Sequence, residues 1–334
     1  MKDLARETGR MVTFNLQQID EAPDLYKQAL RGLDEARAEG ITNLRGQFSG
    51  RPVGVLMGWE TSVHPFLGHP EYVKWMKRPP RERLEQLRRP EVKARLLEGG
   101  ALRIDALPKN APIPPVFLQF LTAATQKMYP MGARQDYEPD PSDSVAGRVR
   151  ATGRSPAEIV YDALMDQDGR GLLYFPLFGY ATSRFDAIEE TLLHPQTGIS
   201  LADGGAHCGA ICDAGTPTFM LTHWVRDRRR GPRLPIEFIV RRQTLDTAHQ
   251  YGLLDRGALL PGLKADVNVI DFERLALGLP EMRHDFPAGG RRLYQGATGY
   301  VATLVSGQVI FEQGKATGAL PGSLIRGARS IPTA

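Results

Sequence analysis

The sequence has little of what disulfide-bonded, membrane and secreted proteins need. Only Cys208 and Cys212 of its 334 residues are cysteines, too few for a disulfide framework, so a reducing compartment is expected. No apolar run approaches the roughly 20 residues that span a bilayer, and the N-terminal MKDLARETGR lacks the apolar core of a secretory signal. These absences predict a cytoplasmic protein without a membrane partner.

An excess of one charge is also lacking. The 42 basic and 38 acidic residues leave a net charge of +4. One basic run, from Arg226 to Arg233, is interrupted by Asp227 and is not followed by interleaved aromatic residues, so a solvated loop is predicted there. Nucleic acid is therefore not an expected partner.

Three familiar catalytic motifs are missing as well. The sequence contains no G-x-x-x-x-G-K-[ST], no G-x-S-x-G and no H-E-x-x-H. Phosphate-loop, α/β-hydrolase and zincin mechanisms therefore have no motif support.

What is present is an alternation of strands and helices. A strand at 11–16, a helix at 22–38 and a strand at 41–44 are the local signature of a parallel sheet. Further strands are predicted at 171–176 and 197–203, and helices at 71–98 with a break, 155–165, 185–193, 216–226 and 234–248. The C-terminal part is β-rich, and Ser306-Gly307 between two apolar runs predicts a hairpin of 300–305 and 308–312.

Asp203 is the first candidate for chemistry. It ends the strand predicted at 197–203 and precedes Gly204 and Gly205. In a parallel α/β sheet, working residues lie at the C-terminal ends of strands. A carboxylate there can bind a metal or take a proton from a metal-bound water. The alternative is an Asp that caps the next helix.

Four further residues are weaker candidates. Gln47 and Arg51 follow a strand and either contact substrate or form an internal hydrogen bond or ion pair. His64 lies between aromatic residues and either lines a pocket or packs against them, and His207 could stand beside an active site. The cysteine pair is too small a set for a structural zinc site.

Long stretches of the sequence resemble a known family. The run HPQTGISLADGGAHCGAICDAGTPTFMLTHWVR (194–226) resembles the last barrel strand of the amidohydrolase superfamily, and in particular of the N-acyl-D-amino-acid deacylases, or D-aminoacylases. YGLLDRGALLPGLKADVNVIDFERL (251–275) resembles the return from barrel to β-sandwich. Residues 299–327 are similar to the closing hairpin and tail, and residues 45–66 to a mid-barrel segment.

This resemblance implies a fold class and a chemistry. The fold would be α/β, the C-terminal half of a (β/α)₈ TIM-type barrel in residues 1–252 and part of a small β-sandwich in residues 253–334. One or two divalent metals, usually zinc, would activate a water for attack on an amide. Asp203 matches the family's aspartate that binds metal and shuttles the proton.

Two departures from the family pattern refine the expectation. No H-x-H metal pair occurs in the 334 residues, whereas a whole barrel takes about 250 residues and carries this pair on its first strand. Most metal ligands are therefore expected upstream of this chain, and the isolated chain is expected to be nearly inactive. In addition, Ile211-Cys-Asp213 stands where many D-aminoacylases have an arginine for the substrate carboxylate.

The expected activity is metal-dependent hydrolysis of a non-peptide linear amide, such as an N-acyl amino acid. One alternative is a cyclic-amide hydrolase of the hydantoinase type. The other is an inactive fragment, or a subunit that needs a separate N-terminal half. The expected partners are a small amide substrate and either that N-terminal half or further copies of the chain.

Overall fold

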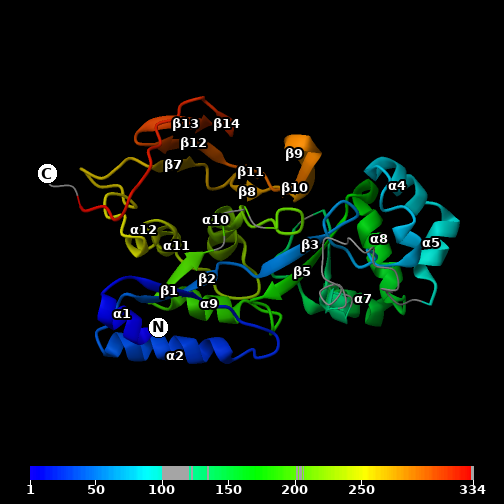
Figure 1. Ribbon diagram of the computed structural model, residues 1–334, viewed down its shortest axis with the longest axis horizontal. Coiled ribbons are helices and arrows are strands. Elements are labelled where there is room, and N and C mark those ends of the chain that lie inside the picture. Colours follow the sequence, from blue (N-terminus) through cyan, green and yellow to red (C-terminus); the bar gives the residue numbers. More distant parts are fainter. Residues whose placement is uncertain are drawn as a thin grey trace.

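The computed structural model describes residues 1–99, 120–121, 123–133, 135–200, 202, 205 and 207–331. Figure 1 shows a parallel sheet near the centre, a group of helices beside an antiparallel sheet at one end, and the C-terminal strands above. No helix in the described part of the chain combines the length and apolar character that crossing a bilayer requires.

The central parallel sheet has three strands in the order β1-β2-β6. They are β1 (Val12–Asn15), β2 (Leu44–Ser49) and β6 (Thr197–Ser200). Asn15 lies opposite Gln47, and Ser49 opposite Ser200, so the three strands end at one edge. The predicted parallel strand–helix–strand unit is confirmed, but its second strand lies at 44–49 and not at the predicted 41–44.

Two helices connect these strands and cover one side of them. α2 (Leu25–Ala38) joins β1 to β2 and buries Tyr26, Leu30, Leu33 and Ala36, an i, i+4, i+7 stripe that packs with Leu16 and Leu44. α9 (Asp186–Leu193) leads into β6. Figure 1 shows α2 and α9 below the sheet and α11 and α12 above it. The short α1 (Lys2–Thr8) precedes β1.

An antiparallel unit is inserted between β2 and α9. Its strands β3 (Val53–Met57), β4 (Tyr129–Met131) and β5 (Leu172–Phe178) form a sheet in the order β3-β5-β4. The strand predicted near 171–176 therefore exists, but it pairs antiparallel and is not a strand of the parallel sheet. Its first five residues are all buried, so no alternation of polar and apolar residues reveals how it pairs.

Short helices pack around this antiparallel unit. They are α3 (Pro70–Val73), α4 (Pro80–Leu87), α5 (Pro90–Leu97), α7 (Val145–Thr152), α8 (Pro156–Gly169) and the 3₁₀ turns η1 (Ala124–Lys127) and η2 (Pro141–Asp143). α8 begins with a capping box: Ser155 Oγ accepts the Glu158 N–H, and the Glu158 carboxylate accepts the Ser155 N–H.

The chain after β6 forms helices and then small sheets. The helices are α10 (Thr216–Phe219), the π-helix η3 (Met220–Asp227), α11 (Ile236–Gln243) and α12 (Leu245–Gln250). The strands are β7 (Val267–Ile270), β8 (Ala276–Leu277), β9 (Glu281–Phe286), β10 (Gly290–Tyr294), β11 (Ala297–Thr298), β12 (Tyr300–Val305), β13 (Gln308–Glu312) and β14 (Lys315–Ala316), with η4 (Pro287–Gly289) between β9 and β10.

The C-terminal strands confirm the predicted hairpin. β12 and β13 pair antiparallel in a sheet with the order β14-β13-β12-β7. Ser306 and Gly307 make the turn with φ angles of 51° and 78°, a left-handed conformation that glycine adopts readily. The α/β class is thus confirmed, whereas the described strands do not close a barrel. The division at residues 252 and 253 stays a prediction.

Candidate functional site

The carboxyl edge of the parallel sheet is the place where the sequence predicts the chemistry. β2 and β6 end there side by side at Ser49 and Ser200. Asp203 follows β6 by three residues and lies outside the described residues. The assignment of this aspartate as catalytic residue and metal ligand therefore stays a prediction.

Gln47 and Arg51 both make internal contacts at this edge. Gln47 Nε2 donates to Tyr251 Oη at 2.8 Å, which ties β2 to the end of α12. The Arg51 side chain is only 2% exposed, and its Nη2 donates to Cys212 O at 2.5 Å and to Asp213 Oδ1 at 3.3 Å. The structure thus shows internal hydrogen bonds for both, and contact with a substrate stays a prediction.

The Arg51 guanidinium also stacks on aromatic rings. Its Cζ lies 3.8 Å from the centre of the Tyr137 ring and 5.8 Å from that of Phe219. Burial alone lowers the pKa of Arg51, but the acidic groups of Tyr137 and Asp213 raise it above its usual value. Arg51 is therefore a fixed cation that holds the segment after Asp203 against the sheet.

His64 lies in the aromatic core, as the packing alternative predicts. It is 1% exposed, and its ring meets Tyr72 edge-on at 4.4 Å and Trp59 at 5.2 Å. Neither ring nitrogen has a hydrogen-bond partner in the described part of the chain. Burial, reinforced by the positive charges of Arg83 and Arg291, lowers the pKa of His64 to about 3, so the ring is neutral at pH 7.

His207 begins a tight turn in the segment that follows Asp203. It has a positive φ of 49°, is exposed, and its carbonyl accepts the N–H groups of Ala210 and Ile211. Three other parts of the chain hold the turn through backbone hydrogen bonds, from Leu56 to Ala210, from Ser62 to Gly209 and from Leu293 to Cys208. The turn is thus fixed by β3, by the loop after β3 and by β10.

The described residues do not fit a metal ion by themselves. No group of three or more His, Cys, Asp or Glu side chains among them could hold one. Cys208 is half-buried and Cys212 is buried, and burial raises the pKa of the Cys212 thiol to about 11, which opposes thiolate formation. Cys212 is therefore a small buried thiol, whereas Cys208 is only half-buried.

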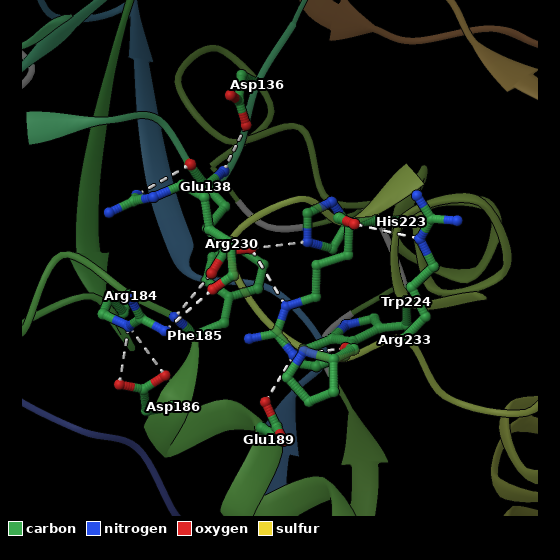
Figure 2. A network of polar contacts seen from close by, with 12 residues as sticks. Asp136, Glu138, Arg184, Phe185, Asp186, Glu189, His223, Trp224, Arg230 and Arg233 are labelled. Atoms are coloured by element: carbon green, nitrogen blue, oxygen red, sulfur yellow. Dashed lines mark hydrogen bonds and ion pairs between the residues drawn. The ribbon is translucent and has the colours of Figure 1, made fainter. Parts of the chain in front are cut away.

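A polar network that the sequence did not predict lies beside this region (Figure 2). Its centre is Glu138, whose side chain is 2% exposed. The carboxylate accepts the Phe185 N–H at 3.1 Å, His223 Nε2 at 3.0 Å and Arg228 Nε at 3.3 Å. Arg228 is fully buried and also donates from Nη1 to Glu189 at 2.6 Å.

Opposing effects set the charge of Glu138. Burial alone raises its pKa, but the hydrogen bond from His223, the charge of Arg228 and the Phe185 N–H together lower the pKa below its usual value. Glu138 is therefore ionised at neutral pH. The His223 ring stacks on Phe219 at 4.6 Å, which fixes its plane as well.

The prediction of a solvated loop at residues 226–233 is right only in part: residues 228–233 form a loop in which Arg229 and Arg233 are exposed, but other arginines of the run are engaged in contacts. Arg228 is buried in the network, and Arg226 donates to the carbonyls of Phe272 and Leu275. Arg230 Nη1 donates to Glu138 O, Pro139 O and Tyr180 Oη. Glu138, Glu189, Phe272 and Leu275, which accept from Arg226 and Arg228, lie far away in the sequence, so the run itself does not reveal these partners.

A cavity of about 840 Å³ lies beside the network. Tyr137, Glu138, Phe219 and His223 line one part of it, and the arginine run lines another. The ring of Tyr137 also carries the Arg51 guanidinium, so the cavity wall is continuous with the contacts at the end of β2.

Comparison with protein families identifies the class. The Amidohydrolase family model Amidohydro_3 matches residues 117–311, more than half of the chain. The chain belongs to the amidohydrolase family. The match includes Asp203 and most of the described network.

Solved structures of D-aminoacylase are similar to the chain. One, studied for the role of the binuclear metal center in D-aminoacylase, is 17% identical with a TM-score of 0.41. Another, described as defining a novel subset of amidohydrolases, gives the same values. In both cases the match covers 95% of this chain and 50% of the other, so this chain spans about half the length of those enzymes. Comparison with curated proteins finds no match.

Proposed function

We propose that this chain is part of a metal-dependent hydrolase of linear amides, in which Asp203 is the general base and a metal ligand. The simplest substrate is an N-acyl amino acid. The observation that carries the proposal is the family match over residues 117–311, in which Asp203 follows a strand of the parallel sheet.

The local structure supports the proposal through the segment on either side of Asp203. β6 ends beside β2 at the carboxyl edge of the sheet, where α/β proteins carry their working residues. The turn after Asp203 is held by hydrogen bonds from three elements, and the segment beyond it by Arg51. These contacts fix the backbone of the described segment from His207 to Asp213, which follows Asp203 in the sequence.

In the proposed reaction the Asp203 carboxylate accepts a proton from the attacking water and returns it to the leaving nitrogen. The water oxygen bonds to the acyl carbon, the carbon–nitrogen bond breaks, and the products are a carboxylic acid and an amine. A divalent metal, which we propose to be zinc, lowers the pKa of water and polarises the amide carbonyl when bound. Ligands besides Asp203 would come from outside the described residues.

A cyclic amide is the second candidate substrate, and one observation favours it. The segment Ile211–Asp213 carries no arginine, and its Asp213 carboxylate pairs with Arg51 at 3.3 Å. This segment therefore presents no basic side chain of its own to a substrate carboxylate. A cyclic amide without a free carboxylate would not need one.

The experiment compares amide hydrolysis by Asp203→Asn and by wild type. Both proteins are expressed with any coding sequence that precedes Met1 and assayed with zinc on N-acyl amino acids and cyclic amides. We expect Asp203→Asn to lower kcat by at least about 100-fold, because positioned acid–base groups contribute on the order of 10²–10⁴-fold. Asp24→Asn is the matched control, since the Asp24 side chain is 78% exposed at the N-terminus of α2. An unchanged kcat in Asp203→Asn contradicts the proposal.

A further inference from the structure

The cavity beside the Glu138 network has the size of a small-molecule site. Its volume of about 840 Å³ lies within the range of roughly 300–1,000 Å³ that is usual for ligand pockets. The π-helix Met220–Asp227 forms part of its wall through Thr222, His223, Arg226 and Asp227. π-Helical turns occur frequently at functional sites.

Three arginines that line the cavity have no carboxylate partner. Arg230 Nη1 donates to two carbonyls and to Tyr180 Oη, which are neutral acceptors. Arg233 Nε donates to the carbonyl of Arg228. Arg229 is exposed and makes no side-chain hydrogen bond or ion pair within the described ranges. None of the three guanidinium groups therefore forms an ion pair within the described ranges. Arg230 still acts on Asp140 at longer range: hydrogen bonds from Ser142 and, to a smaller extent, the charge of Arg230 lower the pKa of that carboxyl.

Five carboxylates line the same cavity, and those of Asp136, Glu138, Asp140 and Asp227 are engaged by other groups, whereas Asp143 is the fifth. Asp227 is paired with Arg226. Asp136 accepts the Glu138 N–H at 2.8 Å, and Asp140 accepts the N–H and hydroxyl of Ser142 at 2.9 and 2.7 Å. Among the described residues, none of the cavity carboxylates forms an ion pair with Arg229, Arg230 or Arg233.

The surroundings fix the position of at least one of these cations. Arg230 is held by three acceptors on two different segments, and the chain before it is anchored through the buried Arg228. A guanidinium fixed in this way loses little conformational entropy when it binds an anion. Its planar set of donors matches the oxygen atoms of carboxylate and phosphate groups.

We propose that this cavity binds a small anion that carries a carboxylate or phosphate group. The guanidinium groups of Arg229, Arg230 and Arg233 would hold that group. Carboxylate and phosphate share the chemistry that the arginines recognise, and the two sources are distinguished by experiment. The binding measurement needs no hydrolysis, so it can fail or succeed independently of the proposed amidohydrolase activity.

The test is calorimetric titration of the 334-residue chain with inorganic phosphate and, separately, with succinate. Sodium chloride at matched ionic strength is the blank. The variant is Arg229→Gln/Arg233→Gln, which leaves the side-chain contacts of Arg228 and Arg230 in place and removes only the hydrogen bond from Arg233 to the Arg228 carbonyl. Arg81→Gln is the matched control, since the Arg81 side chain is 93% exposed on α4. A second readout is protection of Arg229 and Arg233 from phenylglyoxal, measured by mass spectrometry.

We expect at least one of the two anions to bind and to protect both arginines, while Arg81 is modified as before. The double variant should weaken binding by about tenfold or more, with its circular dichroism spectrum and thermal midpoint unchanged, and Arg81→Gln should bind as wild type. If only phosphate binds, the anion recognised by the cavity carries a phosphate group; if only succinate binds, it carries a carboxylate group. The proposal is overturned if neither anion binds above the chloride blank, or if the Arg81→Gln variant loses as much affinity as the double variant. If the double variant is misfolded, the phenylglyoxal experiment on wild type is the test: protection of Arg229 and Arg233 by an anion supports the proposal, and no protection overturns it.

Discussion

Removing the charge of Glu138 should destabilise the protein far more than removing the charge of an exposed glutamate. The substitution Glu138→Gln keeps the size of the side chain and an oxygen that can accept the Phe185 N–H. It removes the negative charge that faces Arg228, whose side chain is 0% exposed. Arg228 then keeps only Glu189 as an ionic partner.

The expected cost follows from the burial of the pair. Breaking a buried ion pair from one side typically costs about 3–5 kcal/mol, because the remaining charge stays uncompensated. The contact of Arg228 with Glu189 at 2.6 Å reduces this cost, so we expect about 3 kcal/mol. The control Glu85→Gln breaks a pair with Arg81 in which the side chains are 60% and 93% exposed, and about 0–1 kcal/mol is expected there.

The assay is urea-induced unfolding followed by tryptophan fluorescence. Trp224 lies under the Arg228 guanidinium, 4.3 Å from the ring centre, so its emission reports on this region. Because the pKa of Glu138 is lowered by folding, its stabilising effect is present above the ordinary glutamate pKa of 4.5 and is lost as the pH falls further. The difference between wild type and Glu138→Gln should therefore be full at pH 7 and smaller below pH 4.5. Equal effects of Glu138→Gln and Glu85→Gln at pH 7 would refute this reasoning.

Two further substitutions test other parts of the fold. Because folding lowers the pKa of His64 to about 3, the unfolded chain binds a proton below about pH 6.5 that the folded chain does not, and wild type should lose up to about 1.4 kcal/mol of stability per pH unit. His64→Phe should remove this dependence of the free energy of unfolding on pH between pH 6 and 5. The control His249→Gln changes an exposed histidine and should keep the dependence. An equal pH dependence in the two variants would show that His64 is not the group that titrates. Ser155→Ala should lower the free energy of unfolding by about 1 kcal/mol through loss of the capping box, and Ser155→Asp should retain most of it. Equal stability of the two Ser155 variants would mean that the cap contributes nothing.

Local patterns predicted much of the fold. The apolar stripe of α2 and the strands on either side of it give the parallel β1-α2-β2 unit, and the two-residue turn at Ser306-Gly307 gives the C-terminal hairpin. β5 shows the limit of such patterns. Its sequence identifies a buried strand, but burial on both faces leaves no alternation, and the pairing direction depends on β3, about 120 residues earlier.

The candidate site was harder to predict because its contacts span long stretches of sequence. Glu138 and Arg228 are 90 residues apart, and neither has a neighbour in sequence that marks it as buried. The arginine run therefore indicates only a charged loop, whereas in the structure one arginine of the run is a core cation and the four others line a cavity. His64 and Arg51 could not be assigned for the same reason. For each residue, a role at a pocket and a role in internal packing differ only in tertiary contacts, which the sequence does not show.

The most direct test of the proposed function is the rate of zinc-dependent amide hydrolysis in wild type and Asp203→Asn, measured alongside the zinc content of both proteins. The account predicts that Asp203→Asn loses at least about 100-fold in kcat and binds zinc more weakly, while Asp24→Asn matches wild type in both respects. Equal turnover and equal zinc content in Asp203→Asn and wild type would contradict it.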